Sequence, residues 1–192
     1  GPCLYRWGAR FVPRHVREQS SLIRPWNSAL NVQPFERLRV ADWGDVHIGP
    51  ISIEHTFAAI ERTLGPIVTG GVTPICVGGD HTITLALLRV LARRHGRLGL
   101  VHFDSHPDTW DRYFGLPYYH GSTFRRAVEE GLIEGSRSIQ VGIRGPLYAP
   151  DDFAFHAPHG FEVLRIEEIK QQGVEWAAGR LARLAGGPVY CS

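Results

Sequence analysis

Residues 98–108 read LGLVHFDSHPD, and this stretch decides the fold that the sequence predicts. Its first half is a short apolar run typical of a buried strand, and charged residues follow at once. Asp104, His106 and Asp108 alternate with other residues, and alternation along a strand points all three side chains the same way. Ligands of open α/β sheets collect beyond the carboxyl ends of the strands. The stretch therefore predicts an α/β sheet with a polar site at its edge.

On either side of this stretch, short apolar runs alternate with amphipathic ones, as expected for repeated βαβ units. Such alternation predicts a three-layer α/β/α fold with a mainly parallel sheet and helices on both faces. The expected strands are residues 40–43, 74–77, 98–103, 138–143 and 163–166, with a further strand beginning in 187–192. The expected helices are a short one near 13–20, then 53–64, 82–95, 123–130 and 174–184.

Length and composition fit one globular domain, since 192 residues carry 43% hydrophobic and 21% charged residues. A net charge of +2, with its arginine pairs in predicted helices, gives no electrostatic footprint for nucleic acid. No stretch approaches the roughly 18 consecutive apolar residues of a membrane span. Cys3, Cys76 and Cys191 are far apart and form no Cys-x-x-Cys pair, so we read them as reduced, buried thiols and expect a cytoplasmic protein.

Both ends of the sequence look cut. The chain contains no methionine, and it stops within the apolar run of residues 187–192, where a strand is expected to begin. We therefore expect residues 1–192 to form a single partial domain that lacks its N- and C-terminal parts.

A second polar segment follows the strand predicted at 74–77. Residues 77–82 read VGGDHT, which places His81 at the start of a helix and leaves Asp80 to cap that helix or to support a ligand. Buried carboxylates and an imidazole are costly unless a cation compensates them, which favours a manganese, zinc or iron site. The alternatives are that Asp104 and Asp108 cap the following turn with His106 exposed, and that residues 78–80 are a glycine turn with an aspartate cap.

The two polar segments together resemble the paired metal motifs of the arginase/agmatinase family of ureohydrolases, as GGDH at 78–81 and FDSHPD at 103–108. The resemblance spans nearly the whole chain. It continues in GARF at 8–11, ADWGDV at 41–46, YHGSTFRR at 119–126 and QVGIRG at 140–145. The stretch at 119–126 is more similar to the agmatinase and guanidinobutyrase branch than to true arginases.

This resemblance implies a binuclear manganese site, with His81 and Asp108 on one ion, His106 on the other and Asp104 bridging them. A bridging water or hydroxide would attack the guanidinium carbon of a small guanidino substrate, such as agmatine or 4-guanidinobutanoate, releasing urea and an amine. His120 matches the histidine that passes a proton to the departing amine. The resemblance also implies a homo-oligomer.

His102 and the other histidines are left out of the predicted site, and Arg144 is as readily a surface ion pair as a contact for a substrate carboxylate. The family carries a further Asp-x-Asp motif that is expected beyond Ser192, so the 192-residue chain alone is expected to be weakly active or inactive. Other readings stay open. They are a formimidoylglutamase or another amidinohydrolase, a non-catalytic metal-binding or scaffolding subunit of an oligomer, and an α/β domain whose acids only cap helices.

Overall fold

Four parallel strands form the centre of the protein in the computed structural model, which describes residues 7–49 and 51–192. Their order across the sheet is β3-β2-β1-β4. The bounds are β1 Leu98–Phe103, β2 Ile133–Ile143, β3 Glu162–Arg165 and β4 Val189–Cys191. Every pairing is parallel, and β1 lies between β2 and β4. The predicted parallel sheet is therefore confirmed.

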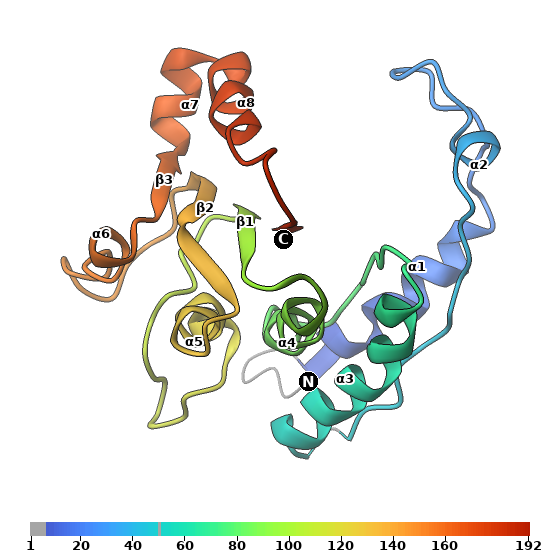
Figure 1. The fold of residues 1–192 in the computed structure, drawn as a ribbon, viewed down its shortest axis with the longest axis horizontal. Helices are drawn as coiled ribbons and strands as arrows, with labels where there is room; N and C mark the ends of the chain where they lie inside the picture. The colour runs from blue at the N-terminus through green and yellow to red at the C-terminus, as the bar shows by residue number, and fades with distance from the viewer. Residues whose placement is uncertain (1–6, 50) are drawn as a thin grey trace.

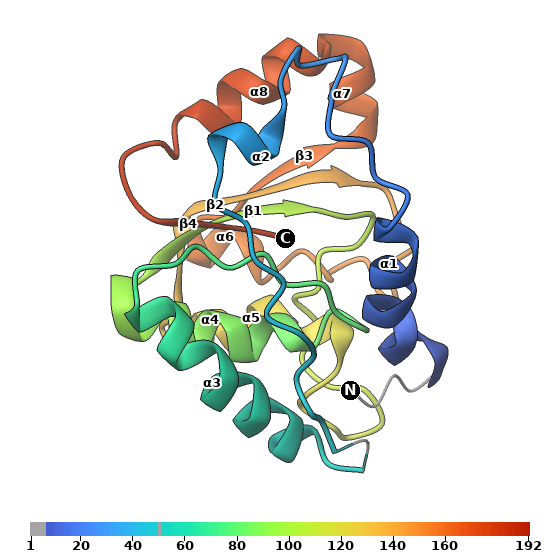
Figure 2. The same ribbon diagram turned by 90° about the vertical axis from the view of Figure 1, so that its right-hand side faces the viewer.

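Helices cover both faces of this sheet, so the predicted three layers are confirmed (Figures 1 and 2). Helices α4 and α5 lie against one face, with α3 packed on the outer side of α4, and α7 and α8 lie against the other face. The longer helices are α1 Val12–Ser20, α3 Ile53–Thr69, α4 Ile83–His95, α5 Thr123–Glu129, α7 Ile166–Gln172 and α8 Val174–Ala182. The short ones are η1 Trp7–Phe11, α2 Pro34–Arg37, η2 His120–Ser122 and α6 His156–His159.

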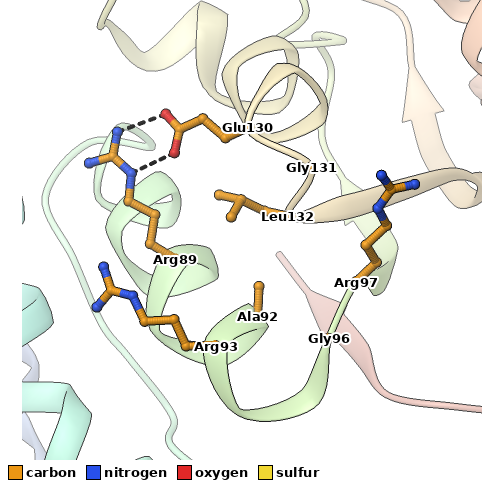
Figure 3. Close-up of a pocket in the computed structure, with 8 residues that line it drawn as sticks. All are labelled: Arg89, Ala92, Arg93, Gly96, Arg97, Glu130, Gly131 and Leu132. Carbon is orange, nitrogen blue, oxygen red and sulfur yellow. Dashed lines mark hydrogen bonds and ion pairs between the residues drawn. The ribbon is translucent and has the colours of Figure 1, made fainter.

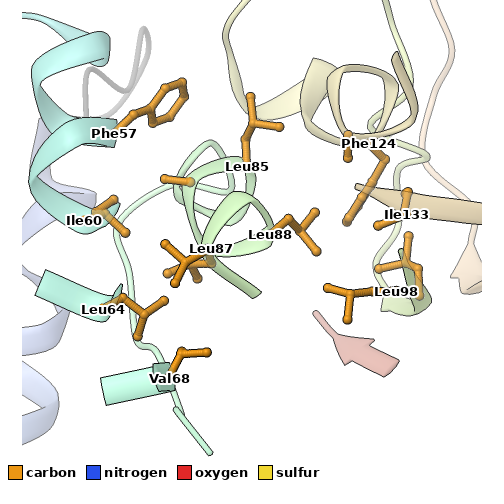
Figure 4. Close-up of a cluster of buried hydrophobic side chains, with 14 of the residues drawn as sticks. Phe57, Ile60, Leu64, Val68, Leu85, Leu87, Leu88, Leu98, Phe124 and Ile133 are labelled. Carbon is orange, nitrogen blue, oxygen red and sulfur yellow. The ribbon is translucent and has the colours of Figure 1, made fainter. Parts of the chain in front are cut away.

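The main hydrophobic core lies around α4, which separates α3 from the sheet (Figure 4). Leu87 turns toward the apolar stripe of α3, whereas Leu88 turns toward Phe124 of α5 and the ends of β1 and β2. The Ser52 side chain accepts a hydrogen bond from the His55 backbone N–H at 3.2 Å, which caps α3 where its apolar stripe begins. Local sequence signals thus define these helices.

Two of the predicted strands are wrong. Residues 40–43 and 74–77 form no strand, and the side chains of Trp43 and Ile75 are 71% and 90% exposed. A strand needs a neighbour that takes up its backbone N–H and C=O groups, and neither segment pairs with the four-stranded sheet. The sheet therefore ends at β4, a short edge strand.

The prediction of buried cysteines is also wrong for the thiols that the structure describes. Cys76 lies on the unpaired segment at 74–77 and Cys191 on edge strand β4, and both residues are exposed. Cys3 lies outside the described residues. Among residues 7–49 and 51–192, no helix combines the length and apolar character needed to cross a bilayer.

The segment before α3 lies outside the layered domain and is largely exposed (Figure 1). Its helices α1 and α2 contain no buried residue. The Arg17 guanidinium links α1 to the stretch that follows α2, because it contacts Asp42 at 2.7 Å and Asp45 at 2.9 Å. It holds the pKa of the Asp42 carboxyl down at about 2.

Candidate metal centre

The chain bends immediately after β1, so the alternation expected through residues 104–108 does not continue as a strand. Asp104 Oδ1 accepts a hydrogen bond from the backbone N–H of His106 at 2.9 Å. The Ser105 carbonyl accepts from the backbone N–H groups of Arg144 at 2.9 Å and Gly145 at 2.6 Å. These contacts fix the bend against the loop that follows β2.

Asp108 reaches the site through its backbone conformation. Its φ is +49°, in the left-handed region that non-glycine residues seldom adopt, and the residue is buried. Its carbonyl accepts the backbone N–H of Phe124 at 3.0 Å, which ties the turn to the start of α5. A conformation of this kind at a polar residue is commonly associated with a functional site.

His81 comes from the turn before α4. Asp80 Oδ1 accepts the backbone N–H of Thr82 at 3.0 Å, which stabilises this turn. Thr82 is the N-cap residue of α4, so Asp80 lies two positions before the cap. The His81 imidazole lies between two partners, with Nδ1 at 2.6 Å from Asp108 Oδ2 and Nε2 at 2.6 Å from Ser192 Oγ. Two loops that are distant in the sequence therefore meet at His81.

Four side chains form a compact group of metal-ligand type at this point. His81, His102, Asp104 and Asp108 each offer a ligand atom, and these atoms all lie within 4.8 Å of one another. His102 and Asp108 are buried, and the other two are partly buried. Two carboxylates this close together repel each other unless a divalent cation compensates their charge. Mixed nitrogen and oxygen donors suit manganese, zinc or iron. The donor set thus fits the metal that the motifs predict.

The site predicted from the sequence does not include His102. Residues 102 and 104 are two positions apart, and side chains two positions apart along a strand point to the same face. This spacing is the sequence signal that places His102 near Asp104. The His102 Nε2 is buried 3.6 Å from Asp104 Oδ2 and makes no hydrogen bond within the described residues.

His106 and His120 border the group without joining it. His106 Nδ1 lies 2.9 Å from Ser105 Oγ and 3.5 Å from Asp104 Oδ1, with the side chain 41% exposed. The carbonyl of His120 accepts a hydrogen bond from the Thr123 hydroxyl at 3.0 Å. The same hydroxyl contacts the His81 carbonyl at 3.3 Å, so His120 lies on the chain segment next to the group.

Opposite effects act on the ionisable groups of the site. Burial raises the pKa of Asp104, but contact with His102 and the His106 backbone N–H outweighs burial and holds that pKa well below its ordinary value. Burial lowers the pKa of His102 by more than the neighbouring carboxylates raise it. Asp104 is therefore an anion and His102 a neutral imidazole near pH 7.

One of two cavities borders the metal-ligand group, and the other is distant from it. The first has a volume of about 340 Å³ and is lined by Asp104 and Ser105 and by Arg144, which follows β2. The other, of about 560 Å³, lies at the far end of α4, where two hydrogen bonds of 2.7 Å join Arg89 to Glu130 (Figure 3). The larger cavity is remote from the metal-ligand group, and its paired charges stabilise the contact between α4 and α5 instead.

The comparison with protein families agrees with the geometry of the site. A profile described as "Arginase family" matches residues 3–192. The chain belongs to the arginase family. Its match to guanidinopropionase of Pseudomonas aeruginosa is 45% identical over 189 residues and covers 97% of this chain and 59% of that protein. Agmatinase, mitochondrial, of Gallus gallus is 40% identical, with 97% of this chain and 55% of the relative covered. This arginase-family chain thus spans less than two thirds of the length of these relatives.

Solved structures share the fold. Proclavaminate amidino hydrolase from Streptomyces clavuligerus superposes with a TM-score of 0.86 at 31% identity, covering 97% of this chain and 62% of that one. Formimidoylglutamase from Bacillus subtilis gives a TM-score of 0.88 at 23% identity, covering 99% and 60%. The second likeness shows the fold alone. The sequence resemblance and the predicted arginase-like architecture are both confirmed.

Proposed function

We propose that this arginase-family protein hydrolyses a small guanidino compound to urea and an amine at a binuclear manganese site. The observation that carries the proposal is the group of His81, His102, Asp104 and Asp108, whose ligand atoms lie within 4.8 Å of one another. Guanidinobutyrase of Pseudomonas aeruginosa, 43% identical over 188 residues, supports the class of substrate.

In this proposal His81, Asp104, His106 and Asp108 would hold the metal ions. Two divalent ions supply a water molecule of lowered pKa and charge stabilisation for a reaction at a guanidinium carbon. His120 gives a proton to the nitrogen of the departing amine, a role suited to an imidazole near neutral pH. Its support is the placement of its segment beside the turn that carries His81.

The proposed substrate is agmatine or 4-guanidinobutanoate. The 340 Å³ cavity beside Asp104 has an exposed guanidinium at Arg144, whose Nη1 donates to the Gly142 carbonyl at 2.8 Å. A substrate with a carboxylate would have this cation available, whereas agmatine carries an amine at that end. Replacing Arg144 by glutamine should therefore raise KM for 4-guanidinobutanoate more than for agmatine.

The proposed function is tested by urea release from the complete protein, stripped of metal and then given Mn²⁺. Agmatine, 4-guanidinobutanoate, 3-guanidinopropanoate and arginine are assayed side by side. Asp108→Asn should abolish turnover because it removes a buried ligand, whereas Asp151→Asn, at an exposed loop position, should leave it unchanged. Lack of urea release from every substrate with Mn²⁺ present, or full activity of Asp108→Asn, would contradict the proposal.

Three further expectations belong to the same proposal. The 192-residue chain alone should be weakly active or inactive, because its ligand side chains are too few to fill the shells of two metal ions that each prefer about six donors. We also propose a homo-oligomer and a cytoplasmic location. Size-exclusion chromatography with light scattering and fractionation of cells producing the complete protein test these two.

A further inference from the structure

A buried row of polar side chains leads away from the metal-ligand group and into the protein. His102 on β1 is paired in register with Gln140 on β2, and Gln140 contacts His156 on α6. The exposed fractions of the three residues are 0%, 0% and 4%. Polar groups this deep must satisfy one another, so the positions of their protons are constrained.

The carbonyl of Pro107 fixes the orientation of the Gln140 amide. Gln140 Nε2 lies 2.6 Å from this carbonyl oxygen, which can only accept a hydrogen bond. With the amide turned over, two oxygens without a proton between them would meet at that distance. Nε2 is therefore the donor, and the choice between amide oxygen and nitrogen follows from the network.

The remaining amide proton of Gln140 determines the tautomer of His102. Gln140 Nε2 also lies 3.2 Å from His102 Nδ1, so Nδ1 must accept and cannot carry a proton. On the other side, Gln140 Oε1 accepts from His156 Nε2 at 2.8 Å. The other His156 nitrogen, Nδ1, lies 3.3 Å from the Phe153 carbonyl. A neutral imidazole has one ring proton, and the shorter distance to Gln140 favours placing that proton on Nε2.

An imidazole with a bare Nδ1 carries its proton on Nε2, and His102 Nε2 faces Asp104 Oδ2 at 3.6 Å. A metal ligand needs a lone pair at the coordinating nitrogen, and this tautomer places a proton there instead. This buried nitrogen has no hydrogen-bond partner within the described residues, and the Asp104 carboxylate at 3.6 Å is an acceptor that a small movement would bring within hydrogen-bond distance.

We propose that Gln140 and His156 are positioning residues that hold His102 as an Nε2–H donor to Asp104, so that His102 orients the Asp104 carboxylate and does not bind metal. This inference rests on the proposed metal site. It divides the group of four side chains into three metal ligands and one supporting histidine. A donor to a ligating carboxylate fixes its direction and tunes its basicity.

The first test reads the tautomer directly and needs neither metal nor activity. In ¹⁵N-histidine-labelled complete protein without metal, long-range ¹H–¹⁵N spectra should show His102 with a protonated Nε2 and a bare Nδ1. The His102→Gln variant identifies the signals by their loss. A His102 that carries its proton on Nδ1, or on both nitrogens, would overturn the inference.

The second test adds ¹¹³Cd²⁺ as a diamagnetic probe of the same site. Cadmium–nitrogen coupling should appear at His81 and be absent at His102, whereas coupling at His102 would make it a ligand and refute the inference. Absence of ¹¹³Cd²⁺ and Mn²⁺ binding altogether would contradict the proposed function, while the tautomer measurement would still decide the role of Gln140.

A pair of matched variants tests the positioning role. Gln140→Met removes the amide at similar length and should release the His102 tautomer, and the Kd for Mn²⁺ should rise by about 10- to 100-fold. Gln171→Met makes the same change at an exposed position of α7 and should leave both readouts unchanged. Unaltered Mn²⁺ affinity and an unaltered tautomer in a folded Gln140→Met protein would contradict the proposal.

Discussion

Substituting alanine for Gly145 should disable one half of the metal site while leaving the fold intact. A Cβ built at Gly145 lies 2.5 Å from His106 Nε2, closer still to Cδ2, and 2.9 Å from the Ser105 carbonyl oxygen. Ordinary contacts begin at 3.4 Å, so the imidazole must retreat by roughly 1 Å. The ring relieves most of the clash, because its side chain is 41% exposed. The Ser105 carbonyl, which is held by two backbone hydrogen bonds, must also shift slightly.

A displacement of this size exceeds the tolerance of about 0.5 Å within which ligands must be held. The ion assigned to His106 should therefore bind about 10- to 100-fold more weakly, while the ion assigned to His81 and Asp108 keeps its affinity. The free energy of unfolding should fall by about 1–3 kcal/mol, because the backbone around the Ser105 carbonyl must shift as well as the ring. The φ of Gly145 lies outside the left-handed region, so the alanine backbone adds no strain of its own.

Calorimetric titration of the metal-free complete protein with Mn²⁺ measures both affinities, and urea-induced unfolding measures stability. Gly179→Ala on α8 is the matched control, because its Cβ meets nothing within 4 Å, and it should raise stability by up to about 1 kcal/mol with unchanged Mn²⁺ binding. Wild-type binding of two ions by Gly145→Ala would refute the placement of His106 as a ligand. A loss of stability well beyond about 3 kcal/mol would show that the backbone, not the ring, takes up most of the clash.

Two further predictions concern stability. Phe124→Ala should lower the free energy of unfolding by about 3–5 kcal/mol, because this ring is fully buried against the imidazoles of the site. The control variant Phe114→Ala, at an 86% exposed side chain, should change it by less than about 0.5 kcal/mol. Chemical denaturation measures both values. Burial lowers the pKa of His156 to about 4 from 6.5, so the unfolded state binds the proton more tightly. The contribution of His156 to the free energy of unfolding should therefore be fully present above pH 6.5 and decrease as the pH falls toward 4. His156→Gln should make the free energy of unfolding less dependent on pH in this range. His47→Gln, at an exposed position, should leave the pH dependence unchanged.

The elements that the sequence predicts well are those whose signals are local. The apolar stripe at Phe57, Ile60 and Leu64 lies on one helix face, and all three residues are buried in α3. Strand β1 has the predicted bounds because a strongly apolar run is paired on both sides. Residues 40–43 and 74–77 have equally good strand composition but no partner, and pairing is a property of the tertiary structure that a single segment does not encode.

The sequence predicts three residues of the candidate site that the structure brings together, but not the geometry that brings them together. The motifs identified His81, Asp104 and Asp108, and the structure brings these three together. Strand alternation does not explain how, since Asp108 arrives through a left-handed turn that depends on contacts with α5. The role of His102 depends on Gln140, 38 residues away, and only the pairing of β1 with β2 places the two side by side.

Anomalous diffraction at the manganese edge, from crystals of the complete protein grown with Mn²⁺, tests the central claim most directly. We expect two peaks beside Asp104, one close to His81 and Asp108 and the other close to His106. We expect no direct bond from either ion to His102. An empty site at saturating Mn²⁺, or peaks elsewhere on the protein, would show that these residues do not form the metal site.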